Sequence, residues 1–210
     1  RADRYTYLPQ IGLYILVTWG AMELCTRWGV HRKVLAVPAL LVMVVLAACT
    51  YHEAFYWENS EKLWQHAIDN TSNNDIARYN LGIVLLRKRQ PEAALVEFQK
   101  ALQINPGYGD ADVDAGSALM RMGRTDQAIS YFQRALQIKP DFAEAWSNLG
   151  SALLQKGRVD EAIQCYQKAV AIEPRSADMH YNLGRSLARK GNWYGAIACY
   201  QVALRTQPTA

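Results

Sequence analysis

The residues best suited to hold a ligand form a column of amide side chains that recurs every 34 residues. Its members are Asn80, Asp114, Asn148 and Asn182. A primary amide offers two N–H donors and one carbonyl acceptor, so a row of amides can pair with the backbone of an extended peptide without reading its side chains. Asp114 offers only acceptors and interrupts the row. The column predicts a peptide-binding surface, and the alternative interpretation is a solvated polar face on packed helices.

A second column at the same interval carries positive charge. It consists of Arg87, Arg121, Gln155 and Arg189, and Arg185 stands one helical turn before Arg189. Guanidinium groups form bidentate, charge-assisted hydrogen bonds with carboxylates. These arginines predict a preference for a peptide with acidic side chains or a free terminal carboxylate.

No other constellation in the sequence points to catalysis, a cofactor or a metal. His31, His52, His66 and His180 are scattered and lack metal-ligand spacing. Cys165 and Cys199 occupy one column, where equivalent positions are too far apart for a disulfide, and are interpreted as small core or surface residues. No Gly-rich phosphate loop or nucleophile elbow is present. The net charge of +4 is too small to indicate nucleic acid as a partner.

The elements that must position these columns are four consecutive units, 75–108, 109–142, 143–176 and 177–210. Seven columns recur at the same interval without a gap. They include the glycines Gly82, Gly116, Gly150 and Gly184 and the aromatic residues Phe98, Phe132, Tyr166 and Tyr200. A fixed period of this length is the signature of a repeat architecture.

Each unit is predicted to contain two helices. Apolar residues recur at helical spacing in two runs, split by a turn at Gly123, Gly157 and Gly191, with Arg89 in the first unit. The small Gly and Ala columns let two helices approach closely, and the Phe/Tyr column is expected to fill the space between neighbouring pairs. One unit cannot bury its own apolar face. The sequence therefore predicts an all-α, right-handed solenoid with a concave inner surface.

This pattern resembles the tetratricopeptide repeat over residues 75–210. The resemblance implies protein or peptide binding, because asparagine ladders in such arrays hold peptide substrates. Residues 51–74 are interpreted as a connecting half-repeat whose helix, Ser60–Asn70, caps the first unit. At the other end we expect either that the parent chain continues beyond Ala210 or that Ile197, Tyr200 and Leu204 remain partly uncovered, and this face offers a possible route to self-association.

The first fifty residues have a different composition. They hold seven charged residues, whereas the other 35 of the chain's 42 lie beyond them. Val34–Cys49 contains sixteen residues without a polar side chain, and Leu8–Leu24 is a weaker apolar stretch. Together they predict a transmembrane helical hairpin over residues 1–50, and a buried helix of a soluble protein is the alternative for the stronger stretch.

The connection between these stretches sets the predicted orientation. Cys25–Lys33 carries Arg27, Arg32 and Lys33 and no acidic residue. By the positive-inside rule this connection lies in the cytoplasm, which places the repeats on the extracytoplasmic side of the membrane.

The opening motif RADRYTYLP, two apolar stretches and a YWENSEKLWQHA segment before the repeats form a recognisable order of parts. It resembles the C-terminal portion of bacterial multi-spanning membrane proteins related to glycosyltransferases that use lipid-linked sugars. The animal O-mannosyltransferases with tetratricopeptide repeats are organised similarly. The resemblance implies a bacterial inner-membrane location, with the periplasm on the repeat side, and a catalytic acid in an early loop that precedes this chain.

Arg4 and Tyr5 of this motif are expected at the extracytoplasmic membrane surface. There Arg4 could bind a lipid phosphate, and simple anchoring at headgroup depth is the alternative. Two functional hypotheses follow. The first is a membrane-tethered module that captures an extended peptide or protein partner. The second is the acceptor-recognition portion of a polytopic membrane glycosyltransferase whose catalytic part lies upstream.

Overall fold

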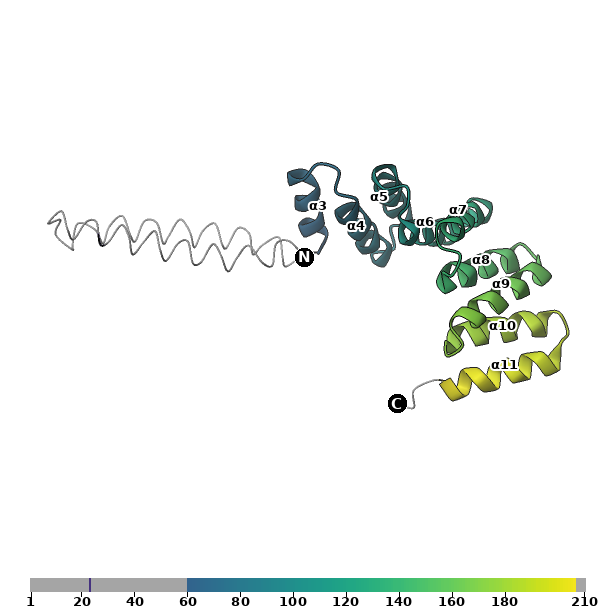
Figure 1. The fold of residues 1–210 in the computed structure, drawn as a ribbon. Helices are drawn as coiled ribbons and strands as arrows, with labels where there is room; N and C mark the ends of the chain where they lie inside the picture. Colours follow the sequence, from purple (N-terminus) through teal and green to yellow (C-terminus); the bar gives the residue numbers. More distant parts are fainter. Residues whose placement is uncertain (1–22, 24–59, 207–210) are drawn as a thin grey trace. The chain divides into compact units, whose positions relative to one another are not determined.

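The computed structural model describes Glu23 and residues 60–206. The predicted hairpin, with Arg4 and Tyr5, lies outside the described residues apart from Glu23. Within the described part, no helix combines the length and the apolar character needed to cross a bilayer. The helices from Ser60 onward belong to one compact unit, Asn59–Ala210. This unit is an all-helical solenoid, as the repeat columns predicted (Figure 1).

The solenoid begins with α3 (Ser60–Asn70), the segment predicted to be a helix, and continues as four helix pairs. These are α4 (Asp75–Arg87) with α5 (Pro91–Ile104), α6 (Gly109–Arg121) with α7 (Thr125–Ile138), α8 (Ala143–Gln155) with α9 (Val159–Ile172), and α10 (Ala177–Arg189) with α11 (Trp193–Thr206). The first helices start 34 residues apart, and so do the second helices.

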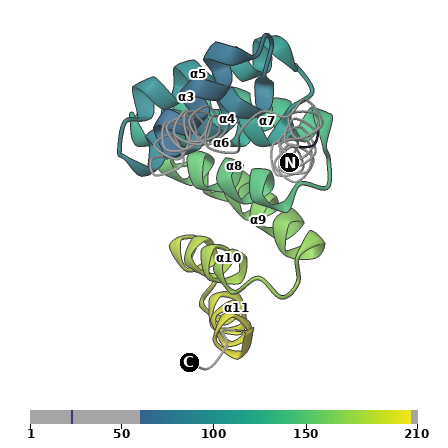
Figure 2. The same ribbon diagram turned by 90° about the vertical axis from the view of Figure 1, so that its left-hand side faces the viewer.

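The helices stack in chain order, each packing against the next (Figures 1 and 2). The first helices also contact each other, since α4 meets α6, α6 meets α8 and α8 meets α10. Between Ser60 and Thr206 no two second helices make such contacts. The first helices therefore lie closer together than the second helices do.

The turn inside each pair needs a left-handed residue. Gly123, Gly157 and Gly191 have φ values of 75°, 78° and 86°, and Arg89 takes this role in the first pair at 62°. Glycine adopts such angles without steric cost. Pro91 occupies the first turn of α5, where its missing N–H is not needed.

Inside each pair an aromatic ring lies on a glycine. A Cβ added to Gly82 or Gly116 would come within 2.5 Å of the ring of Phe98 or Phe132, respectively. Both rings are buried. The Phe/Tyr column was expected to fill the space between neighbouring pairs, and its contact with the glycine column lies within one pair. The Phe98 and Phe132 rings thus require the small residue that faces them.

One column changes its chemistry along the array. In the third and fourth pairs an aromatic ring bonds a preceding carbonyl, since Trp146 Nε1 donates to Pro140 O at 2.8 Å and His180 Nε2 to Pro174 O at 2.9 Å. The first two pairs use ion pairs at this position. Arg78 bonds Glu97 at 3.0 Å, and Asp112 accepts from Arg134.

The last helix exposes apolar side chains that earlier helices bury. Ile197 is 54% exposed, whereas its counterparts Leu95, Ile129 and Ile163 are 6–8% exposed. Leu204 is 72% exposed, against 7–8% for Leu102 and Leu136. In the first three pairs the first helix of the following unit packs against the second helix. In this chain Ile197 and Leu204 of α11 are exposed, and Tyr200 is half-buried.

Candidate ligand-binding surfaces

The amide column lies on the first helices, one residue per helix. Asn80 is on α4, Asp114 on α6, Asn148 on α8 and Asn182 on α10, and all four are half-buried. Because these four helices contact each other in turn, the fold places the column along one continuous face. We call the exposed side of α4, α6, α8 and α10 the first-helix face.

The first two members of the column are already engaged. Asn80 Nδ2 donates to the Ile76 carbonyl of its own helix at 2.7 Å. Asp114 accepts a 2.8 Å hydrogen bond from the Tyr79 hydroxyl, which links α4 to α6. Burial raises the pKa of Asp114, while the Tyr79 hydroxyl opposes this shift. Burial and the charge of Asp114 raise the pKa of Tyr79, so its proton stays on the phenol.

The last two members are available. The amides of Asn148 and Asn182 make no hydrogen bond to any residue that the structure describes. Each retains two donors and one acceptor. The free amides therefore cluster on α8 and α10 and not along the whole column.

Two of the predicted arginines bond the backbone of the preceding unit. Arg121 Nη1 donates to Leu86 O at 3.0 Å, and Arg189 Nη1 approaches Leu154 O at 3.4 Å. These carbonyls lie in the last turn of a first helix, and each also accepts a 3.1 Å hydrogen bond from the turn that follows, Leu86 O from Arg89 N and Leu154 O from Gly157 N. Arg87 and Arg185 are exposed. These contacts with backbone carbonyls could not be predicted from the sequence, because a residue column does not show a backbone acceptor.

Carboxylates lie on the first helices before the amide column, whereas the arginines of the second column lie after it. Asp110 on α6 and Glu144 on α8 stand four residues before the amide column. Burial raises the pKa of Glu144, and the charges of Asp114 and Asp110 raise it further. These two carboxylates were not predicted as part of the site, although their spacing of four residues from the amide column is visible in the sequence. The face is thus acidic at one edge and basic at the other.

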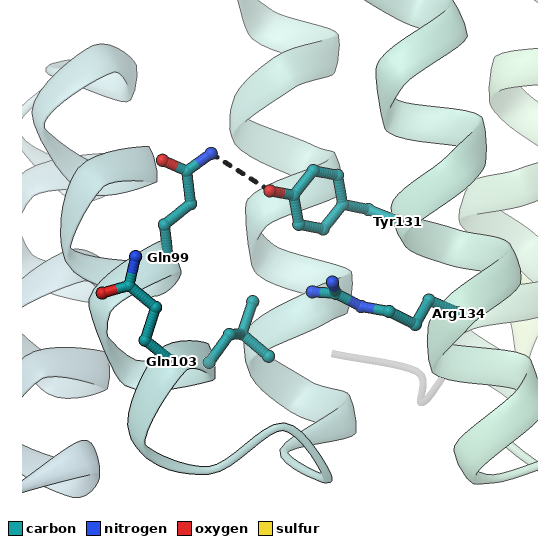
Figure 3. Close-up of a pocket in the computed structure, with 5 residues that line it drawn as sticks. Gln99, Gln103, Tyr131 and Arg134 are labelled. Atoms are coloured by element: carbon teal, nitrogen blue, oxygen red, sulfur yellow. Dashed lines mark hydrogen bonds between the residues drawn. The ribbon is translucent and has the colours of Figure 1, made fainter.

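A pocket of about 290 Å³ lies away from this face, between α5 and α7. Its lining residues are Gln99, Leu102, Gln103, Tyr131 and Arg134. Figure 3 shows the two glutamines on one side and Tyr131 and Arg134 on the other. Gln99 Nε2 donates to the Tyr131 hydroxyl at 3.1 Å. Arg134 lies 4.9 Å from the centre of the Tyr131 ring.

Behind this pocket Arg134 pairs with a buried carboxylate. Arg134 Nε donates to Asp112 Oδ1 at 2.7 Å, and Nη2 bonds the same oxygen. Asp112 is fully buried, and its Oδ2 has no hydrogen-bond partner. Burial raises the pKa of Asp112, and the Arg134 guanidinium opposes the shift. The hydrogen bond to Asp112 raises the pKa of Arg134, so the guanidinium stays charged.

The described residues hold no cluster of His, Cys, Asp or Glu that could bind a metal ion. Cys165 is buried, Cys199 is half-buried, and both are free thiols. Burial raises the pKa of Cys165 to about 11, so this thiol is not a reactive thiolate at neutral pH.

Comparison with known families identifies the repeat. Residues 113–175 match one description of the tetratricopeptide repeat, and residues 85–130 and 153–210 match another. Together the matches run from residue 85 to residue 210, more than half of the chain. The chain belongs to the tetratricopeptide repeat family.

Solved tetratricopeptide repeat structures share this fold. A crystal structure of MamA superimposes with a TM-score of 0.65 at 22% identity, covering 75% of this chain and 92% of MamA. YrrB, described as a tetratricopeptide repeat protein with an unusual peptide-binding site, gives 0.60 at 27% identity, covering 77% of this chain and 83% of YrrB.

Among curated proteins, the tetratricopeptide repeat chain is similar to O-mannosyl-transferases. It is 28% identical to human Protein O-mannosyl-transferase TMTC3 over 115 residues, which is 55% of this chain and 12% of that protein. It is 29% identical to Drosophila melanogaster Protein O-mannosyl-transferase Tmtc2 over 109 residues, which is 52% of this chain and 11% of that protein. The match therefore spans about an eighth or less of the length of these relatives.

Proposed function

We propose that the chain is a protein-binding module whose first-helix face forms a groove for an extended peptide. The observation that carries the proposal is the pair of unengaged amides, Asn148 and Asn182, on adjacent first helices. Both can bond a peptide backbone at no cost in internal hydrogen bonds. The description of YrrB as a peptide-binding repeat protein supports the same use of the fold.

The engaged side chains of Asn80 and Asp114 favour α8 and α10 as the position of the peptide in this proposal. A ligand at Asn80 would compete with the Ile76 carbonyl, and a ligand at Asp114 would compete with the Tyr79 hydroxyl. Arg185 and Arg189 follow Asn182 on α10, and both residues are exposed. A peptide carboxylate beside these arginines gains charge-assisted hydrogen bonds.

Replacing both Asn148 and Asn182 with alanine is expected to weaken peptide binding about thirtyfold, because each of the two lost hydrogen bonds is worth about 1 kcal/mol. Fluorescence anisotropy can measure this, using a labelled peptide selected from a random library by the unmodified chain. Asn80→Ala is the matched control. It occupies the same column, but its amide is already bonded within α4, so it should leave the Kd nearly unchanged.

Far-UV circular dichroism should show that both variants fold. Equal affinities for the unmodified chain and the Asn148/Asn182 double variant would contradict the peptide assignment. Equal losses in the double variant and in Asn80→Ala would show that the peptide covers the whole column and not only α8 and α10.

A second candidate is the acceptor-recognition portion of a membrane glycosyltransferase. The similarity of the repeats to two O-mannosyl-transferases favours it. In this proposal residues 1–50 form the membrane hairpin, the repeats lie outside the cytoplasm, and catalysis resides upstream. A longer reading frame with further apolar spans before Arg1 would support it. Protease added to intact spheroplasts should digest the repeats, and their protection would contradict the orientation.

Self-association is a further proposal, through the uncovered face of α11. Ile197 and Leu204 occupy columns that the next first helix covers in earlier units. A second copy could bury the same side chains. Light scattering should then show a dimer that Ile197→Lys dissociates, and a monomer at all concentrations would exclude this route.

A further inference from the structure

The pocket between α5 and α7 is lined by second helices and is separate from the first-helix face. Its volume of about 290 Å³ suits a small ligand. Buried Leu102 supplies an apolar surface, and polar side chains supply the rest of the lining.

Arg134 is held in the pocket wall by Asp112. Two guanidinium nitrogens, Nε and Nη2, bond one carboxylate oxygen, and Nη1 makes no hydrogen bond to any described residue. A buried ion pair adds little net stability, because desolvation offsets the attraction between the charges. The ion pair with Asp112 holds the Arg134 guanidinium beside the pocket and leaves its Nη1 group without a partner among the described residues. The Asp112 carboxylate also balances the charge of Arg134.

The other polar groups leave donors and acceptors unused. The Tyr131 oxygen accepts from Gln99, so its own O–H remains free to donate. Gln99 keeps a free carbonyl acceptor. The Gln103 amide makes no hydrogen bond within residues 60–206. The pocket therefore offers both donors and acceptors, while the charge of Arg134 is matched by Asp112.

This mixture distinguishes between classes of ligand. A carboxylate or phosphate only accepts hydrogen bonds when ionised, so it could use the donors of the pocket but make no bond to the Gln99 carbonyl. A hydroxyl group both donates and accepts. We propose that the pocket between α5 and α7 binds a neutral ligand with several hydroxyl groups, such as a single sugar residue.

This set of residues occurs once in the array. The counterparts of Tyr131 are Glu97, Cys165 and Cys199, none of which carries a phenol. The counterpart of Arg134 in the next unit is Lys168, whose ammonium lies 4.1 Å from the centre of the Trp146 ring. The Asp112–Arg134 pair and Tyr131 therefore make the site specific to the second unit.

Saturation-transfer NMR on the full chain, kept free of sugar-based detergents, tests this proposal. The probes are the methyl glycosides of glucose, galactose, mannose and N-acetylglucosamine, with acetate as the anionic comparison. We expect at least one glycoside to bind with a Kd on the order of 1 mM, as suits a small ligand with few contacts. Acetate should neither bind nor compete.

Variants then locate the binding. Tyr131→Phe removes only the hydroxyl and should weaken glycoside binding about fivefold, the loss expected for one hydrogen bond. Gln103→Leu should have a similar effect. Gln167→Leu, in the same column as Gln99 but on α9, should leave binding unchanged. The proposal is overturned if no glycoside binds, if acetate displaces the glycoside, or if Tyr131→Phe and Gln103→Leu bind as the unmodified chain does.

Discussion

Replacing Phe132 with alanine is expected to lower the free energy of unfolding of the array by about 4 kcal/mol, because the truncation leaves a cavity where a large buried ring stood. Phe132 is 1% exposed, and its ring fills the space above Gly116. Urea unfolding followed by far-UV circular dichroism measures the loss. A change below about 1 kcal/mol would mean that the ring is not held as the structure places it.

The glycine opposite the ring provides the companion test. A Cβ on Gly116 would come within 2.5 Å of Phe132, whereas a Cβ on Gly150 would stay 3.0 Å from Tyr166. Alanine favours the helix by about 1 kcal/mol over glycine, and overpacking opposes this by about 1–3 kcal/mol. Gly116→Ala should therefore be more destabilising than Gly150→Ala. The reverse order would contradict the packing in these two pairs.

The helical solenoid could be predicted from the sequence because the same residue types recur at equivalent positions in four units. Gly123, Gly157 and Gly191 mark turns that need a positive φ, and Pro91 marks the start of a second helix. Agreement among equivalent positions compensates for the weakness of any one signal. The aromatic column was predicted to fill space between packed helices. The column alone does not show which helix each ring contacts.

The candidate surfaces could be predicted only in part. Helical spacing and the repeat period bring the amide column to one face, yet the engagement of Asn80 depends on a side-chain rotamer that bonds Ile76 O. Arg121 bonds a carbonyl of the preceding unit, which no residue type reveals. Asp112 stands in the column that holds Trp146 in the next unit, Arg134 bonds it from the next helix, and only the fold brings these two together.

Replacing Arg134 alone with alanine is expected to cost about 3 kcal/mol at neutral pH, because it strands the buried Asp112 carboxylate. This estimate is at the low end of the usual range, since the Arg134 side chain is 47% exposed. The double variant Asp112→Leu/Arg134→Ala carries no stranded charge and should be close to the unmodified chain. Urea unfolding of both variants gives the comparison. Equal losses in the single and double variants would contradict the ion-pair interpretation.

The cost of Arg134→Ala should also depend on pH, in a direction fixed by Asp112. Burial already raises the pKa of this carboxyl, and removing Arg134 takes away the interaction that lowers it. The folded variant then binds a proton at a higher pH than the unfolded chain, whose Asp pKa is about 3.9. Its deficit relative to the unmodified chain is therefore full at neutral pH and shrinks as the pH falls towards about 4, where Asp112 is protonated in the folded variant. The double variant lacks this carboxyl, so its difference from the unmodified chain should vary much less over the same range. If the deficit of Arg134→Ala stayed constant with pH, the cost would come from lost packing of the arginine stem and not from the stranded charge.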